Sequence, residues 1–162
     1  MTFYDLLWYF TIYSFLGWCS EVIFATVTTG KFVNRGFLNG PVCPIYGFGM
    51  SLVLLVLLPF SDNIPLLFIG GALLTSAIEL VGGWALKKFF HTTWWDYSNQ
   101  PFNLGGYICL KFSILWGLCV VVVIRIVHTA IASLVHWMPF TLGAILVGIF
   151  IALFITDTIV TV

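Results

Sequence analysis

The chain has 162 residues, of which 61% are hydrophobic and 7% are charged, and its formal net charge is zero. An ordinary soluble domain carries roughly 25% charged residues, so this composition excludes a soluble globular domain and predicts an integral membrane protein. The sequence has no basic run, so nothing supports nucleic acid as a partner.

Apolar segments of about 20 residues are long enough to cross a hydrocarbon core as helices. The segments here predict an all-α membrane protein, a single integral membrane domain over residues 1–162, with about five transmembrane helices. The first should remain as a helix, because MTFYDLLW lacks the basic residue of a signal peptide. Using Gly, Pro and Asn as boundaries, the predicted spans are 3–27, 45–60, 65–86, 108–127 and 139–161. The segment 130–137 is too short to cross and is expected at the membrane interface.

The second span is short and follows a connection rich in glycine and proline, NRGFLNGPVCPIYG. Short spans interrupted by these residues are typical of re-entrant or discontinuous membrane helices, whose bent backbone lies inside protein. We therefore expect the connections after the first and third spans to fold back into the bundle.

Lysine and arginine predict the orientation. The connections after spans one and three carry Lys31 with Arg35, and Lys87 and Lys88 with Lys111. These connections should face the cytoplasm of a multi-pass cell-membrane protein, with the N-terminus outside and the C-terminus inside.

A weak pseudo-repeat relates residues 6–60 to residues 65–127, with the fifth helix, 139–161, outside it. Each half has a glutamate late in its first helix, then a polar connection, then a second helix. Two crossings per half would give the halves parallel topology. The alternative is an unrelated pair of hairpins.

Glu21 and Glu79 are the strongest functional signal. A charged residue within a membrane helix costs on the order of 2.5–3.5 kcal/mol, so such residues usually face a partner, a bundle interior or water. Two neighbouring carboxylates predict a bound proton or a cation between them. The alternative is that each glutamate pairs with a basic residue and serves packing. Arg35 and Lys111 are the candidates, and either could instead hold an anionic ligand.

The two connections supply further candidate binding groups. Asn39 and Tyr46 belong to the first connection, and Asp96 and Asn103 to the second, where Gly105 and Gly106 permit a tight turn and close approach of a ligand. Neighbouring tryptophans are equally typical of an interfacial aromatic belt. We expect these groups to line one cavity on the cytoplasmic side. The predicted substrate-binding residues are Glu21, Arg35, Asn39, Tyr46, Glu79, Asp96, Asn103 and Lys111.

No metal site and no cofactor are predicted. The three histidines are scattered, and the four cysteines lack metal-ligand spacing. Asp157, late in the fifth span, is expected near the water interface, with a bundle interior or a second copy as the alternative.

Three blocks carry a family resemblance: FLGWCSEVIF around Glu21, NRGFLNGPVCPIYGFG, and WWDYSNQPFNLGGYICLKFSILWG with Glu79 upstream. Over residues 6–125 they resemble the bacterial membrane proteins of the putative ABC-transporter type IV, or putative permease, family. The resemblance implies a membrane subunit energised by a separate ATPase subunit, since the chain contains no P-loop.

Three functions remain open at this point. The first is a permease-like transport subunit, and the second is a membrane-embedded enzyme acting on a lipid or isoprenoid headgroup. The third is a structural or accessory membrane subunit. Five spans make a narrow bundle in contact with membrane lipid, so we expect a homo-oligomer or a hetero-complex.

Overall fold

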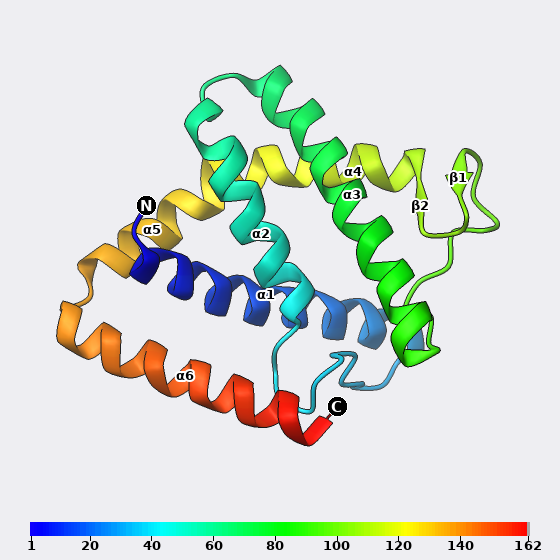
Figure 1. Ribbon diagram of the computed structural model, residues 1–162. Helices are drawn as coiled ribbons and strands as arrows, with labels where there is room; N and C mark the ends of the chain where they lie inside the picture. The colour runs from blue at the N-terminus through cyan, green and yellow to red at the C-terminus, as the bar shows by residue number, and fades with distance from the viewer. Residues whose placement is uncertain (162) are drawn as a thin grey trace. The chain divides into compact units, whose positions relative to one another are not determined.

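The computed structural model describes residues 1–161 (Figure 1). The chain packs as two compact units, which are described separately. Unit 1 contains Met1–Ser51 and Ala130–Val162, and unit 2 contains Leu52–Thr129.

Four helical segments are long and apolar enough to cross a membrane: Phe3–Thr29, Ile64–Phe90, Leu110–Trp137 and Phe140–Thr161. The first, second and fourth are α1, α3 and α6. With 27 residues, α1 and α3 each extend about 40 Å, more than the hydrocarbon core requires. The shorter α2, Pro44–Leu57, continues into the 3-10 turn η1, Leu58–Phe60. The prediction of an all-α membrane protein is confirmed.

The helix that contains the fourth predicted span does not end at Val127. The helix α4, Leu110–Val122, continues through the π-helical turn η2, Val123–Val127, into α5, His128–Trp137. Residues 110–137 therefore form one apolar helical segment, and the position of residues 130–137 at the membrane interface stays a prediction.

The ends of the long helices follow local sequence signals. Thr2 and Asp5 form a capping box at the start of α1, and Gly30 ends that helix in the left-handed conformation at φ 70°. Asn63 caps α3 by accepting a hydrogen bond from the backbone N–H of Leu66 at 3.0 Å.

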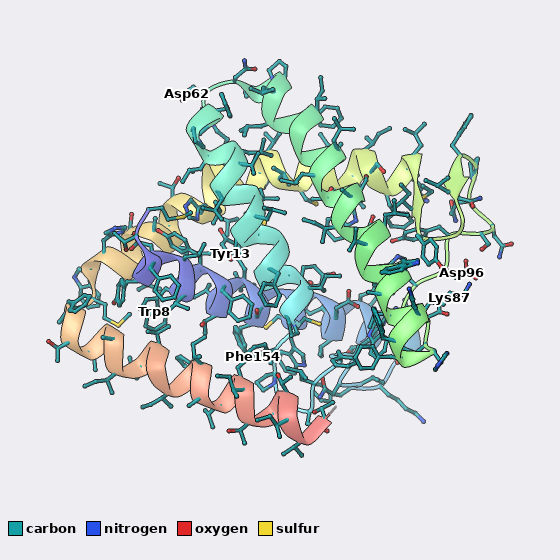
Figure 2. The ribbon with its side chains drawn as sticks, viewed as in Figure 1. Trp8, Tyr13, Asp62, Lys87, Asp96 and Phe154 are labelled. Atoms are coloured by element: carbon teal, nitrogen blue, oxygen red, sulfur yellow. The ribbon has the colours of Figure 1, made fainter. Side chains whose placement is uncertain are left out.

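In unit 1, α1 and α6 lie side by side (Figure 1). Aromatic rings from the two helices meet between them. Trp8 meets Phe150 edge-on at 6.2 Å between ring centroids, and Phe10 meets Phe154 at 5.3 Å. Figure 2 labels Trp8 and Phe154, which point from their two helices toward this contact. Such pairs stabilise the contact beyond the area they bury.

The first turns of α2 pack closely against α1 because glycines face the contact. A Cβ at Gly17 would collide with the Tyr46 side chain, and a Cβ at Gly47 would collide with the Ser14 hydroxyl. Membrane helices approach closely through small residues of this kind.

In unit 2, α3 and α4 form the main contact, again through small residues. Gly71 lies against Val120, and Gly117 lies against the backbone carbonyl of Phe68. The Ser76 hydroxyl donates a hydrogen bond to the Ser113 hydroxyl at 2.6 Å across the same contact. Polar side chains between membrane helices commonly pair in this way.

The connection between α3 and α4 forms a short antiparallel hairpin of β1, Asn103–Leu104, and β2, Ile108–Cys109. Gly105 and Gly106 turn the hairpin at φ 60° and 76°, a conformation that glycine adopts without strain.

Large apolar side chains remain exposed along all four long helices, for example Ile23, Leu73, Leu118 and Ile159. Contiguous apolar exposure on this scale is unusual for a soluble monomer and suits contact with lipid.

Candidate functional site

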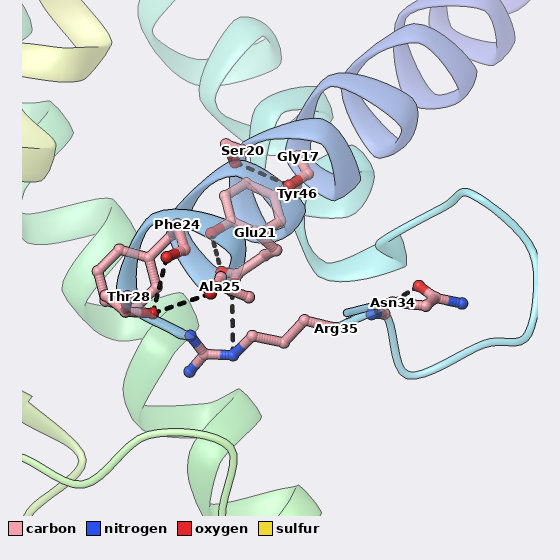
Figure 3. Close-up of polar contacts among 10 residues, drawn as sticks. Gly17, Ser20, Glu21, Phe24, Ala25, Thr28, Asn34, Arg35 and Tyr46 are labelled. Carbon is pink, nitrogen blue, oxygen red and sulfur yellow. Dashed lines mark hydrogen bonds and ion pairs between the residues drawn. The ribbon is translucent and has the colours of Figure 1, made fainter. Parts of the chain in front are cut away.

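Glu21 lies on α1 and receives two partners from the residues that follow the helix (Figure 3). The Tyr46 hydroxyl donates a hydrogen bond to Glu21 Oε1 at 2.6 Å. The Nε atom of Arg35 lies 3.5 Å from Glu21 Oε2 and forms an ion pair. We call these three residues the Glu21 cluster, which is one of the two arrangements that the sequence left open for this glutamate.

The Glu21 cluster is partly shielded from solvent. The Arg35 and Glu21 side chains are 33% and 23% exposed, and the Arg35 guanidinium also lies 5.2 Å from the centre of the Phe24 ring. An opposite charge at this distance offsets much of the cost of placing a carboxylate in a membrane helix.

Asn34 folds the connection that carries Arg35. Its Oδ1 accepts hydrogen bonds from the Trp18 indole N–H at 2.7 Å and from the backbone N–H of Gly36 at 3.2 Å. Its Nδ2 donates to the backbone carbonyl of Asn39 at 2.9 Å. Trp18 lies in the middle of α1, so these bonds fold the connection back along that helix.

Glu79 lies on α3 and has a different environment. The Trp116 indole N–H donates to Glu79 Oε1 at 3.0 Å, and the Tyr97 hydroxyl donates to the same oxygen at 3.2 Å. Glu79 Oε2 is buried and has no hydrogen-bond partner among residues 1–161. We call Glu79, Tyr97 and Trp116 the Glu79 cluster.

Lys111 does not occupy the place that Arg35 has beside Glu21. Its Nζ lies 5.7 Å from the centre of the Phe112 ring, and no ion pair joins it to Glu79 within the described chain. The possible salt bridge between Lys111 and Glu79 is therefore absent from the structure. Trp116 and Tyr97, which the sequence analysis did not single out as partners, are the donors instead.

Asp96 and Asn103 fold the second connection onto itself. Asp96 Oδ1 accepts hydrogen bonds from the Ser98 hydroxyl and backbone N–H, and these bonds hold the pKa of this exposed carboxyl below its usual value. Asn103 Nδ2 donates to the carbonyls of Ser98 and Gln100, and its Oδ1 accepts from the Gly106 N–H at 3.2 Å. Both side chains therefore shape the turn, and their use in binding stays a prediction.

One family model, described as putative ABC-transporter type IV, matches residues 8–162. The chain belongs to the putative ABC-transporter type IV family. No curated protein and no solved structure matched the chain. Together with the four apolar helices, the family places the chain in a membrane and suggests association with an ATPase subunit.

In this member of the putative ABC-transporter type IV family, Asp157 of α6 also contacts the first connection. Its carboxylate accepts hydrogen bonds from the backbone N–H groups of Asn39 at 3.2 Å and Gly40 at 2.8 Å. The Asn39 side chain donates to the same carboxylate at 3.4 Å and to the Thr161 hydroxyl at 2.7 Å. Asn39 was predicted to bind substrate, and the structure shows it bound to α6.

The sequence offered one signal for this contact. A carboxylate near the C-terminal end of a helix meets the negative end of the helix dipole, so it needs hydrogen-bond donors from elsewhere. Asp157 therefore anchors the connection that delivers Arg35 to Glu21, although it touches neither residue in the described contacts.

Cys43 ends this connection and can report on its closure. It is 6% exposed, and burial, with a smaller contribution from the charge of Glu21, raises the pKa of its thiol to about 11. At pH 8 about one thousandth of the thiol would be thiolate, so alkylation should be slow and should accelerate as the pH rises toward 11.

We expect Asp157→Asn to increase the alkylation rate of Cys43 several-fold at pH 8. The asparagine amide has one acceptor oxygen where the carboxylate has two, so it cannot hold both backbone N–H groups equally well. Residues 30–43 should therefore open more often. The measurement uses a chain whose other three cysteines are replaced by alanine. Thr156→Val is the control, because the hydroxyl of Thr156 donates to the carbonyl of Ala152 within its own helix. Equal rates in the two variants would contradict the anchoring role.

Within residues 1–161, no group of three or more His, Cys, Asp or Glu residues is arranged to hold a metal ion.

The predicted site residues separate into the Glu21 cluster, the Glu79 cluster, the Asn39 contact with Asp157, and the folded second connection. Their arrangement around a single shared cavity stays a prediction.

Proposed function

We propose that the chain is a small permease-like subunit of a membrane transport complex, energised by a separate ATPase subunit. One observation carries this proposal. Glu79 lies in a long apolar helix, yet only neutral donors reach it and one of its oxygens is buried without a partner in the described chain.

This arrangement is costly for a residue that serves packing alone. Ionisable residues within membrane helices are rare, and they usually mark substrate, ion or proton pathways. A carboxylate kept for structure is expected to be closed by a basic partner, as Glu21 is by Arg35. Glu79 is therefore our candidate group on the transport pathway.

The Glu21 cluster supports a second role within the same chain. Its ion pair with Arg35 and its bond from Tyr46 occupy both carboxylate oxygens. This favours a structural role for Glu21, which joins α1 to the first connection and α2. The alternative in which a glutamate pairs with a basic residue and serves packing therefore fits Glu21 better than Glu79.

The basic residues of the two connections support an orientation for the complex. Lys31 and Arg35 lie in or beside the first connection, and Lys87, Lys88 and Lys111 lie beside the second. If α2 and η1 cross the membrane as a fifth, shorter span, the positive-inside rule places both connections in the cytoplasm, with the N-terminus outside and the C-terminus inside. A cytoplasmic ATPase subunit would then meet the chain on this side.

The test is purification of the tagged full-length chain from its native membrane in mild detergent. We expect ATP hydrolysis to co-elute with the chain and to be absent from a purification of untagged chain. At equal amounts of chain, Glu79→Ala should change the hydrolysis rate several-fold. Leu73→Ala is the matched control in α3, because Leu73 is an exposed apolar side chain of the same helix, away from the basic connection. A chain that elutes as a homo-oligomer without ATP hydrolysis would overturn the proposal.

A further inference from the structure

We propose that the ligand of the Glu79 cluster is a proton, so that Glu79 is a carboxylic acid in the resting protein whereas Glu21 is a carboxylate. The inference deepens the proposed function and rests on it for the use of this proton in transport. The protonation state itself can be measured on the isolated chain.

The hydrogen-bond donors of the Glu79 cluster reach one of the two carboxylate oxygens. Both donors, Trp116 and Tyr97, bond to Oε1, whereas Oε2 is buried and unpartnered within residues 1–161. An ionised carboxylate spreads its charge over both oxygens and needs donors or cations on each. Leaving a neutral hydroxyl without a partner costs much less than leaving a buried charge uncompensated.

The charged groups on the elements packed around Glu79 make contacts with other residues. On α3, Lys87 lies over the Tyr107 ring at 5.8 Å and Lys88 over the Trp84 ring at 4.6 Å. On α4, Lys111 lies over the Phe112 ring. The second connection contributes Asp96, whose bonds go to Ser98. None of these groups forms an ion pair with Glu79 in the described part of the chain.

The surroundings of Glu79 Oε2 limit the size of the ligand it can bind. A metal ion at Oε2 would need several converging ligands, and no suitable group occurs among residues 1–161. An organic cation would need open space at an oxygen that is buried. A proton needs neither further ligands nor space.

The Glu21 cluster provides the internal comparison. There Arg35 supplies a positive charge to Oε2, the oxygen that corresponds to the unpartnered one in Glu79. In both clusters a tyrosine hydroxyl bonds to Oε1. The clusters thus share a neutral donor and differ in the cation, which is the group that favours the ionised form.

Loss of the proton would leave Oε2 as the atom that needs a new partner. Tyr97 belongs to the second connection, and its ring stacks on Phe112 at 4.6 Å between centroids. A change of charge at Glu79 is therefore transmitted directly to the connection through Tyr97 and to α4 through Trp116.

Infrared spectroscopy tests the proposal on the whole chain in lipid nanodiscs at neutral pH. We expect a carbonyl stretch of a protonated carboxylic acid that shifts in D₂O, disappears in Glu79→Gln and persists in Glu21→Gln. Because glutamine resembles the neutral acid, Glu79→Gln should unfold within a few degrees of the wild type, whereas Glu21→Gln should unfold at a clearly lower temperature.

Tyr97→Phe keeps the test informative if Glu79→Gln fails to fold. It removes one donor to Oε1 and should shift the band without abolishing it. Absence of the band from the folded wild type, loss of the band in Glu21→Gln, or an unchanged band in Tyr97→Phe would overturn the proposal. The infrared sample contains no ATPase, so it is independent of the purification test. The band together with no ATP hydrolysis in the purification would count against the proposed function alone. ATP hydrolysis in the purification without the band would count against the proton site alone.

Discussion

Replacing Gly47 with alanine is expected to lower the free energy of unfolding by about 1–3 kcal/mol, the usual cost of overpacking a tight contact. The added Cβ would collide with the Ser14 hydroxyl and would lie 2.7 Å from the backbone carbonyl oxygen of Phe10. A backbone atom of α1 cannot rotate away as a flexible side chain can, so α2 must move. Thermal unfolding in detergent, followed by tryptophan fluorescence, measures the effect.

Gly148→Ala in α6 is the matched control, because a Cβ at that position would meet no atom within 4 Å. Alanine is a better helix former than glycine by about 1 kcal/mol, so this variant should be unchanged or more stable. Equal destabilisation of the two variants would show that α2 does not pack on α1 as described.

The second expected result is a strong coupling between Glu21 and Arg35. Glu21→Gln and Arg35→Gln should each lower the free energy of unfolding by about 1–3 kcal/mol, between the values of exposed pairs and of fully buried pairs. Each single substitution leaves one charge without its partner. The double variant leaves neither, so it should be more stable than the sum of the two losses predicts.

The pair formed by Arg125 and Asp62 serves as the control for this cycle. Its nitrogen and oxygen atoms lie 3.2 Å apart, closer than in the Glu21 cluster, but the two side chains are 45% and 102% exposed. Substitution of Asp62 by asparagine should therefore change stability by less than about 1 kcal/mol. Strictly additive losses at Glu21 and Arg35 would contradict the ion pair.

The two glutamates have different partners in the same protein. Glu21 is held by a cation and a tyrosine from the connection that follows its helix. Glu79 is held by an indole and a tyrosine, and no cation among residues 1–161 forms an ion pair with it. If the chain descends from a duplicated unit, the first copy keeps a structural carboxylate and the second keeps a titratable one. The pseudo-repeat itself stays a prediction.

Some residues of the candidate site were predictable because their cost is local. A glutamate inside a run of apolar residues is unfavourable wherever the helix packs, so Glu21 and Glu79 could be recognised without coordinates. Arg35 was predictable as a partner because it is one of few basic residues in an apolar chain. The donors Trp116 and Tyr97 were hidden, since tryptophan and tyrosine are also common as interfacial residues.

Asp157 illustrates what sequence reasoning could not reach. Its partner Asn39 is 118 positions away in the chain, and no periodicity or spacing connects two positions at that separation. The continuation of the helix through 130–137 was missed because that segment is too short to cross a membrane by itself, whereas the helical backbone continues into it from residue 110.

The amino-acid sequence alone determined that the chain is an all-α membrane protein of this family, because hydrophobic length and local motifs are properties of contiguous residues. It also identified the two glutamates, because the cost of their burial depends on the helix that carries them. Only the tertiary structure decided that Arg35 pairs with Glu21 and that Glu79 has neutral donors alone. Those pairings depend on where separate segments meet, which packing determines.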